Sequence, residues 1–104
     1  MARDINFTIH TGELTSEPKL HLLKNSKKIL TFTLKVTEKF ELADGTPASH
    51  SNFFMFEALG RHAETYYKDL KLGRKYQVNG YLRHDNVDGE DKVRIRCFNI
   101  QTAD

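Results

Sequence analysis

Apolar and polar residues alternate along much of this chain, which is the pattern of β-strands with one buried face. Apolar side chains take every second position from Ile5 to Ile9, so a strand with this face buried is predicted. The clearest alternation runs over residues 30–37, where four apolar residues face one way and three threonines and a lysine face the other. Further strands are predicted over residues 52–59, 76–82 and 93–98.

Turn-forming residues separate these strands. Residues 39–51 are rich in small and polar side chains and contain Asp44-Gly45, which predicts a long mobile hairpin loop. Asp88-Gly89 predicts a tight turn between the last two strands. After Gly60, an apolar stripe at helical spacing predicts a helix of about ten residues that Gly73 ends as a left-handed cap; the stripe consists of Ala63, Tyr66, Tyr67 and Leu70.

The order of these elements predicts the fold. A strand, one short helix and another strand, in a chain otherwise made of strands, indicate an all-β, five-stranded Greek-key barrel of the OB type with the helix between strands 3 and 4. The length of 104 residues suits one domain, and no linker or repeat divides it, so a single domain over residues 1–104 is expected. Barrels of this type commonly bind single-stranded nucleic acid.

The net charge of +2 is too small to indicate a polyanionic partner, but the charges are unevenly distributed. Between Lys19 and Lys39 there are six lysines and one acid, whereas four acids and one arginine lie between Arg83 and Asp91. The lysine-rich stretch has two explanations that the sequence leaves open. It is either an ordinary solvated surface or part of a groove that follows phosphates.

Catalysis, cofactors and membranes are not indicated. The single Cys97 excludes an intrachain disulfide and favours a cytoplasmic protein. No apolar run approaches the roughly 18 residues of a membrane-spanning helix. The five histidines show no metal-ligand spacing, and no glycine-rich phosphate loop follows a strand. We therefore expect a protein that is not an enzyme and that requires no cofactor.

Five short segments follow one another in a recognisable order: Gly12–Pro18, Leu30–Leu34, Leu59–Glu64, Leu70–Gly73 and Val78–Arg83. No single segment is decisive, but with this order the chain resembles bacterial single-stranded DNA-binding proteins of the OB-fold type over roughly residues 5 to 101. The resemblance implies sequence-tolerant binding of single-stranded DNA in replication, recombination or repair. In this family bases stack on aromatic rings while cations follow the backbone.

The resemblance also implies which side chains contact the nucleic acid. Phe40 and Phe53 stand where the family usually has stacking aromatics, although each ring can instead serve packing. A surface cation is often only solvated, so phosphate contacts are less firmly indicated. The candidates for them are Lys35, Arg61, Arg83, Arg94 and Arg96.

Several positions depart from the family pattern. Leu59 and the neighbourhood of Val87 replace expected aromatics, which permits apolar contact but no stacking. Asp85 and Asn86 stand where basic residues are usual, and Glu57 shares a strand face with Phe53. Repulsion of phosphate is expected at both acids, and with it a lowered affinity.

The resemblance further implies a homo-oligomer, either a dimer or a tetramer. Ile5 to Ile9 would pair as an edge strand with its copy, and Tyr81 and Phe98 would add an apolar outer patch. The family also has a flexible linker and an acidic tip that recruit replication and repair proteins. Because the sequence ends at Asp104, either a tail was trimmed or the protein is a tail-less relative similar to the primosomal replication protein.

An accessory adaptor of the primosome type, which binds mainly another protein and DNA only weakly, is the alternative function. RNA binding is a third possibility, because stacking alone does not distinguish ribose from deoxyribose. Exposed rings at Phe40 and Phe53 beside a basic groove would favour the DNA-binding function. Buried rings and an apolar outer patch would favour the adaptor.

Overall fold

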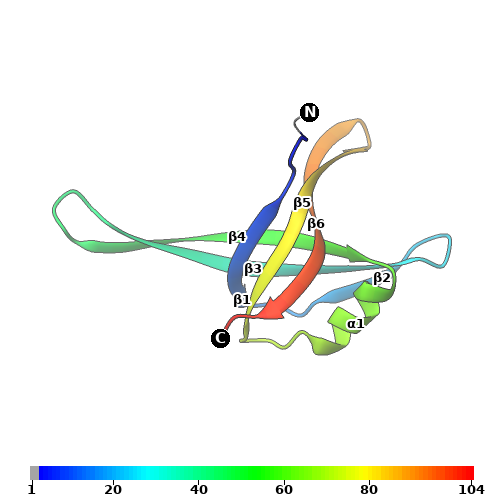
Figure 1. Cartoon of the computed structure of the whole chain (residues 1–104), viewed down its shortest axis with the longest axis horizontal. Coiled ribbons are helices and arrows are strands. Elements are labelled where there is room, and N and C mark those ends of the chain that lie inside the picture. Colours follow the sequence, from blue (N-terminus) through cyan, green and yellow to red (C-terminus); the bar gives the residue numbers. More distant parts are fainter. Residues whose placement is uncertain (1–2) are drawn as a thin grey trace.

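The computed structural model describes residues 3–104, apart from the side chain of Val87. Residues 1 and 2 of the predicted single domain therefore lie outside the described part. So does the side chain of Val87, whose neighbourhood was one of the departures from the family pattern. Within that part, six strands and one helix follow one another (Figure 1). They are β1 (Thr8–Leu14), β2 (Lys19–Leu22), β3 (Lys28–Glu41), β4 (Pro47–Leu59), α1 (Arg61–Asp69), β5 (Lys75–Val87) and β6 (Glu90–Thr102).

Five of the strands close into a barrel. β3 pairs antiparallel with β4, and β5 pairs antiparallel with β1 and β6. β4 lies parallel to β6, and β1 closes the ring against β3 through two residue pairs, Glu13 with Lys35 and Leu14 with Leu34. The predicted five-stranded barrel, with one short helix between its third and fourth strands, is confirmed. β2 is an additional short strand at the outer edge of β3.

The core consists of the inward faces of the barrel strands together with two residues from α1 and the segment that follows it. The rings of Phe32 and Phe56 stack with their centroids 5.3 Å apart. The imidazole of His10 lies 4.7 Å from the ring of Phe54 and 5.4 Å from that of Phe56, and burial lowers the pKa of His10. The buried residues are Leu14, Leu30, Phe32, Leu34, Phe56, Ala58, Ala63, Leu70, Tyr76, Val78, Ile95 and Cys97.

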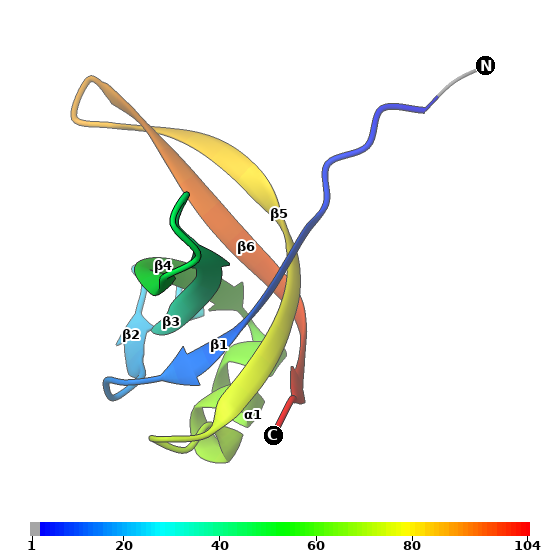
Figure 2. The ribbon, with the colours of Figure 1, turned by 90° about the vertical axis from the view of Figure 1, so that its left-hand side faces the viewer.

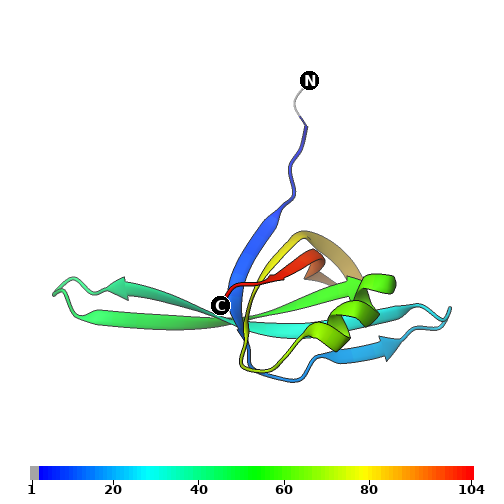
Figure 3. The ribbon, with the colours of Figure 1, turned by 60° about the horizontal axis from the view of Figure 1, so that its bottom comes forward.

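The prediction for the buried face of the first strand is wrong. Ile5, Phe7 and Ile9 are 88%, 53% and 56% exposed. The segment before β1 continues beside β5, where Asn6 exchanges hydrogen bonds with the backbone of Leu82, and the chain then projects beyond the barrel (Figure 3). The inward positions of β1 are instead Gly12 and Leu14, both buried. A Cβ atom on Gly12 would lie 2.6 Å from the backbone oxygen of Lys35, so glycine allows the close approach of β1 to β3. A glycine adds no apolar signal, which is why the alternation pointed to the other face.

The predicted mobile loop over residues 39–51 is also wrong. β3 and β4 remain paired as far as Glu41 and Pro47, and residues 42–46 alone connect them. The result is a long two-stranded ribbon that projects from the barrel (Figure 1) and points toward the viewer in Figure 2. Both faces of this ribbon contact water, so its sequence carries no apolar alternation to reveal the strands.

The helix has about the expected length but a different end. α1 spans nine residues, and the following Leu70 is extended and donates its backbone N–H to the carbonyl oxygen of Tyr66 at 2.9 Å. Gly73 does not cap the helix as predicted. It lies in the next turn, with φ of 82°, and donates its N–H to the carbonyl oxygen of Leu14 at 2.9 Å. The predicted tight turn at Asp88 and Gly89 is confirmed by their positive φ angles of 52° and 82°.

Candidate nucleic-acid interface

The outer face of β3 and β4 carries two exposed apolar side chains beside a cation. Phe53 lies directly opposite Lys35 in the ladder, and Met55 lies opposite Thr33. Residues directly opposite each other in an antiparallel pair project from the same face. Phe53 is 63% exposed and Met55 is 53% exposed. An exposed aromatic ring beside a cation is the arrangement that base stacking and phosphate neutralisation require. We call Lys35, Phe53 and Met55 together the stacking face.

Phe40 does not belong to this stacking face. It pairs with Ala48 and lies five positions beyond Lys35 toward the tip of the ribbon. Successive side chains alternate between faces, so the odd spacing puts Phe40 on the opposite face, about 17 Å further along the strand. Its ring is nevertheless 48% exposed.

A groove of about 460 Å³ lies next to the stacking face. It opens where β1, which pairs with β3 only at Glu13 and Leu14, separates from the ribbon. We call it the lysine groove; its lining includes Gly12 and Glu13 of β1, Lys35, Thr37 and Lys39 of β3, and Lys75 of β5. Lys35 belongs to both the groove and the stacking face, so the two surfaces are continuous.

A second groove of about 500 Å³ lies on the other side of Met55. Lys19 and His21 of β2 line it together with Thr31 and Thr33 of β3. Met55 lines this second groove itself, and Lys19 is accompanied there by the acid Glu17.

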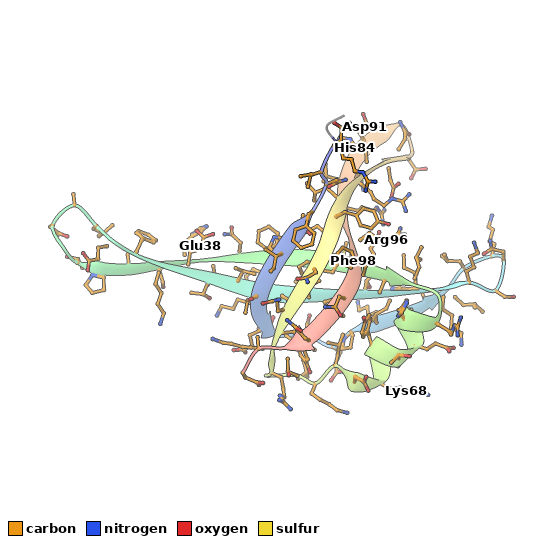
Figure 4. All side chains as sticks on the ribbon, in the orientation of Figure 1. Glu38, Lys68, His84, Asp91, Arg96 and Phe98 are labelled. Carbon is orange, nitrogen blue, oxygen red and sulfur yellow. The ribbon has the colours of Figure 1, made fainter. Side chains whose placement is uncertain are left out.

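Three of the predicted phosphate-binding cations lie on β5 and β6 and are paired with carboxylates of β4 and β5. Arg94 donates to Oε2 of Glu57 at 2.6 Å, and Arg96 lies 3.7 Å from Oε1 of the same side chain. Arg83 lies 3.1 Å and Arg94 3.5 Å from the carboxylate of Asp85. We call these five residues the arginine cluster; Figure 4 shows one of its members, Arg96, beside β6.

Glu57 does not present its charge to solvent, contrary to the expectation that it repels phosphate. The parallel pairing of β4 with β6 places it opposite Arg96, and only 2% of its surface is exposed. A buried carboxylate is tolerated when it is paired and hydrogen-bonded, and here two guanidinium groups cover it. Asp85 is likewise paired with two arginines instead of facing a phosphate freely.

Arg61 is exposed but distant from the stacking face. It begins α1, eight positions after Phe53 and beyond the end of β4. Leu59, where the family pattern suggested an aromatic, is partly buried at the same end of β4. Of the predicted site residues, the structure therefore brings together Lys35 with Phe53, and separately Arg83, Arg94 and Arg96.

Three residues of this region were missed from the sequence. Met55 alternates with Phe54 and Phe56, and its position on the face of Phe53 was the available signal. Lys39 follows Lys35 at even spacing, but the stretch from Lys39 to Ser51 was interpreted as loop. No local sequence pattern could indicate Lys75. It reaches the groove only because Glu13 of β1 pairs with Lys75 of β5 on one side and with Lys35 of β3 on the other.

Other chemistry is little developed in the described part of the chain. Cys97 is a buried free thiol that donates to the carbonyl oxygen of Asn99, and burial raises the pKa of this thiol to about 11, which keeps it protonated. Over residues 3–104 no group of three or more His, Cys, Asp or Glu side chains is placed to hold a metal ion. No helix in that range is long and apolar enough to cross a membrane.

Sequence comparison identifies the family. The profile of the single-strand binding protein family matches residues 5–103. The chain belongs to this family. A curated member, single-stranded DNA-binding protein 1 of Chlorobaculum tepidum, is 27% identical over 97% of this chain, and the match spans 66% of that protein. The recognised resemblance to bacterial single-stranded DNA-binding proteins is thus confirmed.

Solved structures of the family share the barrel. A deletion mutant of the single-stranded DNA-binding protein from Thermus aquaticus superposes with a TM-score of 0.86 and 27% identity, over 100% of this chain and 53% of that one. The Plasmodium falciparum protein, solved in complex with single-stranded DNA, has a TM-score of 0.81 at 18% identity, over 100% of this chain and 99% of its own. At that identity the second likeness shows the fold alone.

Proposed function

We propose that this single domain binds single-stranded DNA without strong sequence preference and serves replication, recombination or repair. The observation that carries the proposal is the exposed ring of Phe53 directly opposite Lys35. A base stacked on an exposed aromatic ring gains about 1 to 3 kcal/mol, and the neighbouring cation neutralises its phosphate. Membership of the single-strand binding protein family supports the same function.

In the proposed mechanism the protein acts by binding alone. It holds only the unpaired strand, so it protects that strand and opposes duplex formation by mass action, with no cofactor and no covalent step. The buried, protonated Cys97 supports a non-catalytic role for the one thiol. A reduced, cytoplasmic setting fits a chain with a single cysteine.

We further propose that copies associate as a dimer or tetramer. Ile5, Phe7 and Ile9 form an exposed apolar strip, and the ring of Phe98 lies 6.0 Å from that of Phe7. Asn6 fixes the strip to β5 by exchanging hydrogen bonds with the backbone of Leu82 at 2.7 and 3.0 Å. Light scattering tests this assembly, and Ile9→Glu should reduce the measured mass.

The adaptor function is the second candidate, and the same apolar strip is the observation that favours it. A replication or repair protein, instead of a second copy, would then cover Ile5, Phe7 and Ile9. The exposed rings of Phe40 and Phe53 and the adjoining lysine groove favour DNA binding as the main activity.

The deciding experiment is a titration of fluorescently labelled oligo-dT of about 35 nucleotides at low and high salt. Duplex DNA and oligo-rU of the same length are the comparison ligands. Binding to oligo-dT that is tighter than to duplex and weakens with salt would support the proposal. Equal binding to duplex, or none at micromolar protein, would exclude it, and preference for oligo-rU would indicate an RNA ligand.

A further inference from the structure

The two sets of cations beside the stacking face differ in what they contact. Each arginine of the arginine cluster has a carboxylate within 3.7 Å, and Arg96 has only 13% of its side chain exposed. Within the described residues, Lys35, Lys39 and Lys75 form no ion pair within 4.0 Å, and all three are exposed. A phosphate approaching the arginines would have to displace existing partners, whereas the lysines are free to bind one.

The charge balance of the arginine cluster also weakens its attraction for phosphate. Three arginines face the two carboxylates of Glu57 and Asp85. Removing Arg94 or Arg96 from Glu57 would leave a buried carboxylate without sufficient compensation, which is energetically costly. The cluster therefore links β6 to β4, and its arginines have little remaining capacity to bind a phosphate.

The lysine groove has the opposite arrangement. It contains three lysines and one carboxylate, that of Glu13, which lies opposite Lys35 and Lys75 in the two ladders. Lys35 also lies opposite Phe53, so a strand whose base stacks on Phe53 has its next phosphates at the mouth of the groove. Lys39 extends the cationic row along the ribbon on the same face.

We propose that the phosphate backbone of bound single-stranded DNA follows the lysine groove along Lys35, Lys39 and Lys75, and not the arginine cluster of β5 and β6. This path rests on the proposed function and specifies it. Glu13 acts as a negative element in the path, because its carboxylate is the one acid that lines the groove.

The test measures oligo-dT affinity against salt concentration for charge variants. Each lost phosphate contact should lower the salt slope by about 0.7, so the triple variant Lys35→Gln, Lys39→Gln, Lys75→Gln should lose about 2 units. Its matched control is Lys24→Gln, Lys27→Gln, Lys68→Gln, which removes the same charge from exposed positions on the β2–β3 turn and on α1, where Figure 4 labels Lys68. The control should retain the wild-type slope to within about 0.5.

Two single variants have different expected effects. Glu13→Gln should raise the affinity and the salt slope, while Arg83→Gln should change the slope by less than about 0.3. If wild type binds oligo-dT but the groove variant keeps its slope, or the control loses as much, the proposed path is wrong. If wild type fails to bind single strands at all, the proposed function itself fails. Urea unfolding of each variant shows that the fold is retained.

Discussion

The two outer surfaces of the barrel contain similar numbers of cations but use them differently. On the side of β1 and β3, Lys35 is exposed next to the 63% exposed ring of Phe53. On the side of β5 and β6, the arginines are paired with Glu57 and Asp85, and Glu57 is almost completely buried. Pairing, not the number of cations, therefore distinguishes a surface available to an anion from a surface that stabilises the fold.

The largest expected effect concerns the structural side of this comparison. Glu57→Leu leaves Arg94 and Arg96 without their shared carboxylate, so the free energy of unfolding should fall by roughly 3 kcal/mol in urea titrations. The matched variant Lys35→Gln removes an exposed, unpaired charge and should change stability by no more than about 0.5 kcal/mol. Equal effects of the two variants would remove the distinction between the surfaces.

A second test uses Cys97, which lies on the inward face of β6 next to Arg96. With a thiol pKa of about 11, the native protein should react with a thiol reagent at pH 8 roughly 100-fold more slowly than the urea-unfolded chain. Glu57→Leu should speed the native reaction if the arginine cluster holds β6 against β4. A wild-type rate equal to the unfolded rate would contradict the packing of this strand.

On the binding side, Phe53→Ala should weaken oligo-dT binding by about 1 to 3 kcal/mol, or roughly 5-fold to 150-fold, because the stacking ring is lost. Stability should stay near that of wild type, since the ring is mostly exposed. Tyr67→Ala, which removes a 44% exposed ring from α1, is the control and should bind normally. Unfolding caused by Phe53→Ala would show that this ring serves packing.

Phe40→Ala should have a smaller effect, below about 1 kcal/mol, because this ring lies on the other face of the ribbon. The double variant with Phe53→Ala should be additive within about 0.5 kcal/mol, as expected for side chains that do not touch. Fluorescence titration of all four proteins measures this cycle. A coupling above 1 kcal/mol would mean that both rings hold the same segment of DNA.

The smallest expected effect is a pH dependence of the stability, and it originates in the core and not in either surface. Burial between aromatic rings lowers the pKa of His10, so the unfolded chain takes up this proton more readily than the folded one. The associated stability is fully present above the ordinary pKa of about 6.5 and is lost as the pH falls below it. Urea unfolding at pH 7.5 and 5.5 should show this loss in wild type and less of it in His10→Asn. His84→Gln, an exposed control, should behave like wild type.

The fold was largely predictable from the sequence because the alternation in β3, the aromatic strand β4 and the helix stripe all depend on burial. Two of the errors, at the first strand and in the ribbon, have a common physical origin. Gly12 packs through its backbone, and both faces of the ribbon beyond Thr37 are exposed to solvent. Neither therefore produces an apolar pattern. The sequence left the rings of Phe40 and Phe53 open between stacking and packing, and the structure places both at the surface.

The candidate site was only partly predictable, because ion pairs depend on contacts between distant strands. Nothing near Glu57 in sequence indicates Arg94, which is 37 positions away. Arg83, Arg94 and Arg96 therefore looked like free cations, and their roles became distinguishable from that of Lys35 only through the pairing of β4 with β6. Lys75 joined the groove in the same way, through β1.

The exposed strip of Ile5, Phe7 and Ile9 has a practical consequence for every stability measurement. If copies of the chain cover this strip, association stabilises the folded state by mass action, and the melting temperature rises with total protein concentration. Variants compared at different concentrations would then show apparent differences unrelated to their substitutions. A dilution series of wild type alone measures how much of its stability comes from the single barrel and how much from association between copies.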